Sequence, residues 1–159
     1  MSLGKTVPGA TSEECAARVM DTIPLVMRFI RADMRDHSAA SLSIPQLRSL
    51  AFLNRNPGAS LSDLAEHLGV TCATASATVE RLVQRNLVQR GDDPQERRRV
   101  ILNLTEEGKH NLKQSQDQTR AHISELLQSL TPEQISNIEE GLGLLKNVFE
   151  QTENKPPQR

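Results

Sequence analysis

Apolar residues recur at helical spacing through most of the chain, and the first such stretch begins at Ser12. One apolar stripe in it repeats with heptad spacing. Its members are Met20, Ile23, Met27, Ile30 and Met34. Pro24 lies inside the stretch and is expected to kink the helix or to split it, because proline lacks an N–H donor. The stripe fits packing within one core and an interface between two copies of the chain equally well.

Three short helices are predicted next, and each begins at a side chain that can cap it. Ser43 and Ser60 open capping boxes, and Thr71 caps a third helix that spans about residues 72–86. The second of these helices ends at Gly69, which suits the left-handed conformation at a helix end. The inner face of the third helix comprises Ala75, Val79, Leu82 and Val83.

The pattern then changes to two short strands around a polar tip. Residues 87–90 are β-prone, and residues 99–104 alternate with Val100, Leu102 and Leu104 on one side. Thr105 caps a long polar helix to about Ser129, and Thr131 opens a last helix with a continuous apolar face. The predicted fold is mainly α with a small β-hairpin wing, in the order of a winged helix-turn-helix.

Composition excludes several classes of function. No apolar run approaches the roughly 18 residues that span a bilayer, and the N-terminal stretch lacks the apolar segment of a secretory signal, so we expect a cytoplasmic protein. The two cysteines and four histidines have no metal-ligand spacing, and no catalytic triad, carboxylate pair or phosphate-binding glycine loop is present. We therefore expect no metal, no cofactor and no enzymatic activity.

The charge is distributed unevenly, although the net charge is -1. Residues 45–103 carry eight basic side chains, all arginine, and six acidic ones. Arginine makes bidentate contacts with phosphate and guanine, so the middle of the chain can bind duplex DNA despite the overall charge.

The helix after Thr71 is the expected recognition helix, because the second helix of a helix-turn-helix enters the major groove. Its outward side chains are small and hydroxyl-rich, which permits close approach to base edges, and an arginine one turn later suits a phosphate. The predicted contacts are Thr71, Cys72, Ala73, Thr74, Ser76, Ala77, Thr78 and Arg81, with Arg85 as a further phosphate contact. In the wing they are Asp93, Arg97, Arg98 and Arg99, where arginine suits a narrow minor groove and an acid can hold one arginine in place.

Four segments of this region resemble the multiple antibiotic resistance regulator (MarR) family of bacterial transcription regulators. They are LSDLAEHLGV, the VERLV turn, the DPQERR wing and the LTEEG that opens the next helix. The resemblance implies a homodimer whose N- and C-terminal helices form a dimerisation domain, with winged-helix lobes on a pseudo-palindromic operator. It also favours the interface explanation of the methionine stripe, and it matches Asp93 and Arg97 to the family's wing pair, with Arg97 in the minor groove.

The resemblance also divides the chain and implies an effector. Residues 12–42 and 105–151 become dimerisation helices and residues 43–104 the DNA-binding lobe. The composition of the two ends predicts disordered tails at 1–11 and 152–159. A small phenolic or anionic compound is expected to bind beside the lobe and weaken DNA binding. The crevice residues by position are Met27, Arg31, Met34, Arg48 and Phe52. Each of these can equally be an ordinary core or surface residue.

Two alternatives stay open at this point. Cys72 lies in the first turn of a helix, where the dipole favours a thiolate, so its oxidation could block DNA binding; a plain packing role explains it more simply. A winged helix can also serve as a protein-interaction module without sequence-specific DNA binding, and binding to its own promoter region distinguishes the two functions.

Overall fold

The computed structural model describes residues 9–38 and 40–153, which fall into two compact units divided between Thr119 and Arg120. The predicted tails at 1–11 and 152–159 lie largely outside the described residues. The elements in chain order are α1 (Ser12–Asp36), α2 (Ile44–Arg55), β1 (Ala59–Ser60), α3 (Leu61–Leu68), α4 (Cys72–Gln84), β2 (Val88–Asp92), β3 (Val100–Leu104), α5 (Glu106–Leu127) and α6 (Pro132–Glu153). None of the described helices is long and apolar enough to cross a membrane.

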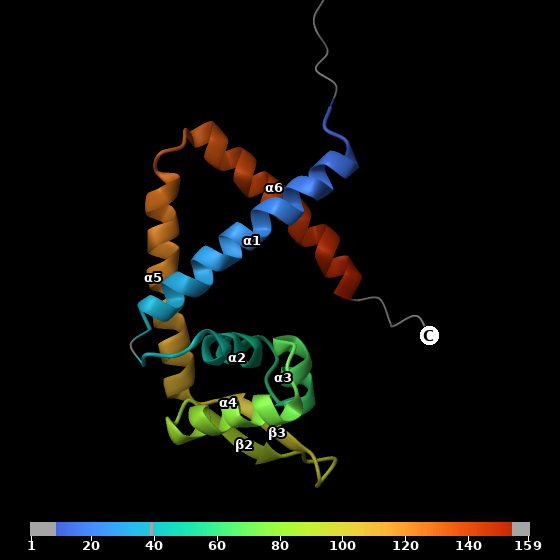
Figure 1. The fold of residues 1–159 in the computed structure, drawn as a ribbon, viewed down its shortest axis with the longest axis vertical. Coiled ribbons are helices and arrows are strands. Elements are labelled where there is room, and N and C mark those ends of the chain that lie inside the picture. The colour runs from blue at the N-terminus through green and yellow to red at the C-terminus, as the bar shows by residue number, and fades with distance from the viewer. Residues whose placement is uncertain (1–8, 39, 154–159) are drawn as a thin grey trace, which may run out of the picture. The chain divides into compact units, whose positions relative to one another are not determined.

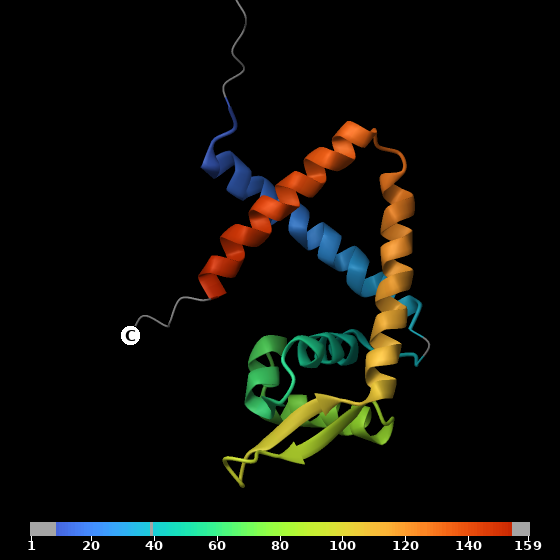
Figure 2. The same cartoon turned by 180° about the vertical axis from the view of Figure 1, so that it is seen from behind.

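The first unit contains the predicted winged helix-turn-helix. Helices α2, α3 and α4 pack together, and strands β2 and β3 extend from them as an antiparallel hairpin (Figures 1 and 2). The sheet has a third strand, β1, which pairs with β3 so that the order is β1-β3-β2. The sequence did not predict β1, because a strand of two residues, Ala59 and Ser60, carries no alternating pattern of its own.

The helix boundaries follow the predicted caps. The hydroxyls of Ser43 and Ser60 each accept a hydrogen bond from the backbone N–H of the third residue of the helix, and the side-chain oxygen of that residue accepts one from the backbone N–H of the cap. The Thr71 hydroxyl accepts from the N–H of Thr74, and Gly69 ends α3 with φ +70°. These four predictions are confirmed. They reflect local chemistry, since a cap satisfies backbone groups within one turn of itself.

The core of this unit is built from leucines and valines of its helices and of strands β2 and β3. Leu50, Leu64, Val79 and Leu82 are fully buried, and Leu102 from β3 is 1% exposed. Burying each such side chain contributes about 1.5–3 kcal/mol relative to leaving it in water. The predicted inner face of α4 is confirmed for Ala75, Val79 and Leu82, while Val83 is half-buried and packs against the core.

The structure differs from the sequence prediction at the ends of several helices and strands, and on one side of strand β3. Val100 is 43% exposed although Leu102 and Leu104 are buried, because it pairs with Asp92 at the outer end of the hairpin, beyond the core. Strand β2 continues to Asp92, two residues further than predicted, and α4 ends at Gln84 rather than near Asn86, which adopts φ +57°. Helix α5 ends at Leu127 rather than Ser129, and α6 continues to Glu153.

Helix α1 runs without a break through Pro24, so of the two expected effects of this proline the split is wrong and the kink stays a prediction. None of its residues is buried. The exposed apolar side chains on it are Met20, Ile23, Leu25, Val26, Met27 and Phe29. Helix α6 of the second unit likewise exposes Ile135, Ile138, Leu142, Leu144, Val148 and Phe149. Two helices that leave apolar side chains in water need a further surface to cover them.

Candidate nucleic-acid interface

Helix α4 is fixed by its buried side and presents small side chains on the other. Ala75 and Val79 are fully buried, which turns the opposite face of the helix outward. Of the predicted contacts, Ser76 and Thr78 are half-buried and the rest are exposed. The exposed ones are Thr71, Cys72, Ala73, Thr74, Ala77 and Arg81. A surface without bulky side chains can approach another molecule closely.

Some of the hydroxyl groups on the outward side of α4 already form hydrogen bonds with other groups of the helix. The Thr71 hydroxyl donates to the hydroxyl oxygen of Thr74 at 3.1 Å, and the Thr78 hydroxyl donates to the Thr74 carbonyl at 3.2 Å. These bonds hold the side chains in defined rotamers. Cys72 is exposed, with its Sγ 4.0 Å from the hydroxyl oxygen of Ser62, and a redox role for it stays a prediction.

The wing tip is a compact turn closed by its own backbone. The N–H of Asp93 donates to the Arg99 carbonyl at 2.9 Å, and the N–H of Arg99 donates to the Glu96 carbonyl at 2.9 Å. The Asp93 carboxylate accepts from the N–H of Gln95 at 2.9 Å. Among the described residues Asp93 forms no ion pair, so its carboxylate shapes the turn instead of holding an arginine.

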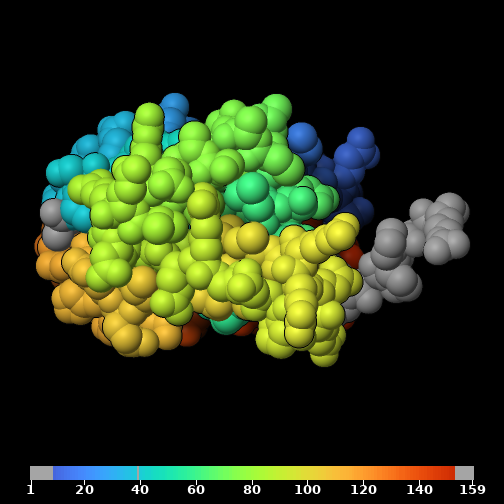
Figure 3. Space-filling view, turned by 90° about the horizontal axis from the view of Figure 1, so that it is seen from below, coloured from blue at the N-terminus to red at the C-terminus, as the bar shows by residue number. Residues whose placement is uncertain are grey.

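The three wing arginines differ in their surroundings. Arg99 forms an ion pair with Asp63 of α3 at 3.6 Å. Arg97 and Arg98 are exposed, and within the described part of the chain neither has an ion-pair partner. Viewed from below, the yellow-green surface of α4 and the yellow wing lie on the same face of the lobe (Figure 3). This face therefore combines a small-residue helix with free guanidinium groups.

Two further contacts join α4 to neighbouring segments of the lobe. Arg90 of β2 pairs with Glu80 of α4 at 3.1 Å, and the Arg85 guanidinium donates to the carbonyl of Ala40. Arg85 thus anchors the end of α4 to the segment before α2, whereas the sequence placed it on phosphate. Hydrogen bonds from Ser60 hold the pKa of the Asp63 carboxyl below its usual value, and the charge of Arg99 adds to this effect.

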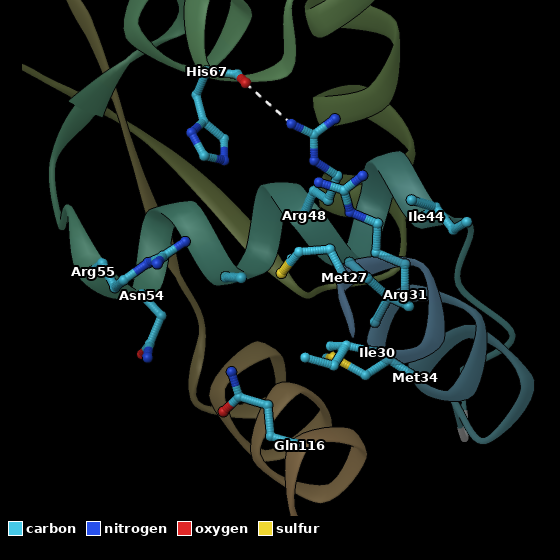
Figure 4. Close-up of a pocket in the computed structure, with 12 residues that line it drawn as sticks. Met27, Ile30, Arg31, Met34, Ile44, Arg48, Asn54, Arg55, His67 and Gln116 are labelled. Carbon is cyan, nitrogen blue, oxygen red and sulfur yellow. Dashed lines mark hydrogen bonds between the residues drawn. The ribbon is translucent and has the colours of Figure 1, made fainter. Parts of the chain in front are cut away.

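A cavity of about 300 Å³ lies between α1 and α2 in the same unit (Figure 4). Four of the five predicted crevice residues line it, namely Met27, Arg31, Met34 and Arg48. Phe52 does not; its ring stacks on the His67 ring with centroids 4.6 Å apart. The sequence missed His67 and Arg55, although Arg55 stands seven residues after Arg48 and so on the same side of the helix.

The cavity wall is cationic on one side and apolar on the other. Arg31, Arg48 and Arg55 face the interior, while Met27 and Ile30 supply apolar surface. Partial burial lowers the pKa of His67, and the charges of Arg48, Arg55 and Arg31 lower it further.

The α2-α3-α4 arrangement with an antiparallel wing defines a winged helix-turn-helix protein. Residues 42–100 match the model of the MarR family. This segment of the chain is similar to the MarR family, and the curated relatives that follow are named as transcriptional regulators.

Two curated relatives are similar to most of the chain. One is the uncharacterized HTH-type transcriptional regulator YfiV of Bacillus subtilis, 27% identical over 74% of this chain and 74% of its own length. Another is the HTH-type transcriptional repressor IacR of Pseudomonas putida, 28% identical over 70% of this chain and 65% of its own.

A solved structure shares the fold. The crystal structure of Streptococcus pneumoniae FabT in complex with DNA has a TM-score of 0.61 and 19% identity, covering 89% of this chain and 99% of that one.

Proposed function

We propose that this protein is a homodimeric repressor that binds a pseudo-palindromic operator through α4 and the wing, and that a small phenolic or anionic compound releases it. The observation that carries the proposal is that α4 and the wing lie on one face of the lobe. The exposed side chains of α4 are small, and Arg97 and Arg98 of the wing are exposed without an ion-pair partner among the described residues. The match of residues 42–100 to the MarR family model and the name of the repressor IacR support repression as the outcome. Such a regulator acts on the chromosome, which places it in the cytoplasm.

The side chains of the face divide by role. Thr74, Ser76 and the neighbouring small residues of α4 read base edges in the major groove, because hydroxyls exchange hydrogen bonds there and methyl groups contact thymine. Arg81, one turn later, binds phosphate. Arg97 enters the adjacent minor groove, whose negative potential attracts a guanidinium group.

The second copy of the chain covers the apolar side chains that α1 and α6 leave exposed. Residues 12–42 and 105–151 then form the dimerisation domain, and residues 43–104 form the DNA-binding lobe. A two-fold dimer places its recognition helices on half-sites about 10 bp apart, centre to centre.

Selection of bound duplexes from a random pool, followed by fluorescence anisotropy on the winning sequence, tests this function. We expect an inverted repeat, and a sedimenting mass twice the 17.6 kDa of one chain. T74A and S76A should change the ranking of duplexes more than the affinity for unrelated DNA. S129A, which removes a hydroxyl outside the face, is the matched control.

Two results contradict the proposal. One is a single-chain mass together with no duplex binding at low salt. The other is a uniform loss of affinity for every duplex in T74A and S76A, because base-reading groups affect sequences unequally. Binding of a protein and of no duplex would instead favour the interaction module.

A further inference from the structure

A second cavity lies where the end of α1, the start of α2 and the later part of α4 meet, within the first unit. Its volume is about 370 Å³. Except for Leu42, the described residues that line it are polar or charged. A molecule that binds in this second cavity is therefore recognised by hydrogen bonds and charge, and not by apolar contact.

Gln46 of α2 brings to this cavity a hydrogen-bond donor that the protein does not use. Its side chain lines the cavity although the residue is only 8% exposed. The Oε1 atom accepts a hydrogen bond from the N–H of Ser43 at 2.9 Å, which leaves Nε2 as the other end of the amide. Within the described part of the chain, Nε2 has no hydrogen-bond partner. Buried polar groups normally have partners, so the arrangement favours an acceptor in the cavity.

Two serine hydroxyls on the same wall are also able to donate. Ser38 Oγ accepts from the N–H of Leu42 at 3.3 Å, and Ser43 Oγ accepts from the N–H of Gln46 at 3.4 Å. Both serines line the second cavity. A hydroxyl that accepts a hydrogen bond keeps its own proton for another acceptor. The wall therefore holds amide and hydroxyl donors together.

Two arginines add positive charge to these donors. Arg81 of α4 is exposed and has no ion-pair partner among the described residues. Arg35 of α1 donates from Nε to the Asp36 carboxylate at 3.1 Å, which leaves its two Nη groups for another acceptor. Asp36 is the only acid among the described lining residues. Two guanidinium groups against one carboxylate, beside neutral donors, favour an anion.

The position of the second cavity indicates which anion it binds. The cyan end of α1 lies on the same face as α4, on the side away from the yellow wing (Figure 3). The Arg85 guanidinium attaches the segment before α2 to the end of α4 through the Ala40 carbonyl. A major groove has a phosphate backbone along each edge. DNA that contacts α4 and the wing therefore presents a further row of phosphates to this side of α4.

We propose that the second cavity binds one backbone phosphate of the duplex, on the side of α4 opposite the wing. This inference rests on the proposed function. The donors are Gln46 Nε2 and the guanidinium groups of Arg35 and Arg81, with the two serine hydroxyls beside them. A phosphate contact fixes register and orientation without reading sequence, so this site sets how α4 is seated in the groove. Through Arg35 it also brings α1 into direct contact with DNA.

The main variant reverses the polarity of the site and keeps the fold. Q46E preserves the capping box, because glutamate also accepts from the N–H of Ser43, and it replaces the amide donor with a negative charge. Q134E is the matched control. Gln134 occupies the same position in the capping box that Thr131 opens before α6, and it is exposed.

A second pair of variants removes charge from α1. R35M deletes the guanidinium group that lines the cavity. R28M deletes one from an exposed position about two turns earlier on the same side of the helix, so it is the control. Each protein is tested as the full chain on its selected duplex. Copies of that duplex carry an uncharged methylphosphonate in place of one backbone phosphate at a time.

Anisotropy over a salt series measures the affinities. We expect Q46E and R35M to weaken duplex binding roughly tenfold, the effect of losing one charge-assisted hydrogen bond, and to leave the ranking of sequences unchanged. R35M should also reduce the slope of log K against log salt by about one. One methylphosphonate position in each half-site should weaken the wild type but hardly affect Q46E, because the partner of that phosphate is already lost. Q134E and R28M should match the wild type.

Three results overturn this assignment. The first is a folded Q46E and a folded R35M that bind duplex as well as their controls, with folding checked by circular dichroism; if Q46E is unfolded, R35M decides. The second is a loss in Q46E and R35M that adds in full to the loss at every methylphosphonate position. The third is calorimetric binding of inorganic phosphate that Q46E abolishes while no methylphosphonate position is coupled to it, which would make the cavity a site for a free anion. Failure of the proposed function is distinct, because the wild type would then bind no duplex at all.

Discussion

Among the described glycines, Gly108 is the one where a Cβ would meet backbone atoms at the shortest distance. It lies in the first turn of α5, where a Cβ would overlap the carbonyl oxygen of Leu87 and stand 3.0 Å from its carbonyl carbon. Both atoms are backbone, so neither can rotate away. The Leu87 carbonyl also accepts a hydrogen bond from the N–H of Thr105 at 3.1 Å, and Leu87 itself is 2% exposed. Gly108→Ala must therefore displace either the helix or a core residue.

The expected change in the free energy of unfolding combines two costs and one gain. Overpacking costs about 1–3 kcal/mol, and weakening the bond between Thr105 and Leu87 costs about 1 kcal/mol. Alanine regains at most about 1 kcal/mol of helix propensity. The net loss in the free energy of unfolding is about 2 kcal/mol, which lowers Tm by roughly 4–8 °C in a chain of this size.

The assay is thermal unfolding by circular dichroism at one fixed protein concentration, since a dimer's Tm depends on concentration. Gly143→Ala is the control, because a Cβ there has no atom within 4 Å and the residue is exposed in α6. It should leave Tm unchanged or raise it. A G108A protein as stable as wild type would refute the close packing of α5 on Leu87.

Three other substitutions or titrations test the electrostatics of the lobe. R97A should cost about 1–3 kcal/mol of duplex affinity and reduce the slope of log K against log salt by about one, measured by anisotropy over a salt series. Asp63 has a lowered pKa in the folded state, so its contribution is present above the unfolded pKa near 3.9 and is lost as pH falls through the folded value. D63N should therefore be less stable than wild type at neutral pH, and the difference should shrink in acid unfolding experiments. The His67 ring should titrate below about 6.5 by NMR, and R48M should raise its pKa, because one of the positive charges that lower it is gone; an unchanged midpoint would contradict the assigned cause.

Much of the fold could be predicted from the sequence because it depends on local chemistry. Ser43, Ser60 and Thr71 each cap a helix through an atom within three residues, so the signal and the structure lie in the same short segment. Burial of Ala75 and Val79 likewise follows from helical spacing alone. By contrast, β1 exists only because Ala59 pairs with Leu102, far along the chain, and no local pattern reports such pairing.

Less of the site could be predicted from the sequence, because many of its contacts are not local. Family resemblance supplied the positions of Arg31 and Arg48, and the structure places both on one cavity wall. The bond from Arg48 to the His67 carbonyl, and the pair of Arg99 with Asp63, each join segments that are distant in sequence. Such partners depend on how helices pack, which spacing within one helix does not specify.

Helix α3 links the cavity to the proposed DNA-binding face. Its first turn is tied to the wing, because Asp63 caps the helix and pairs with Arg99 of the hairpin. Its last turn is tied to α2 through Arg48 and the His67 carbonyl. The helix has eight residues, so these two attachments are about 12 Å apart at most on a rigid rod. Both attachments act on the same short helix, so we expect loss of the Arg48 bond at one end to weaken the Asp63–Arg99 pair at the other.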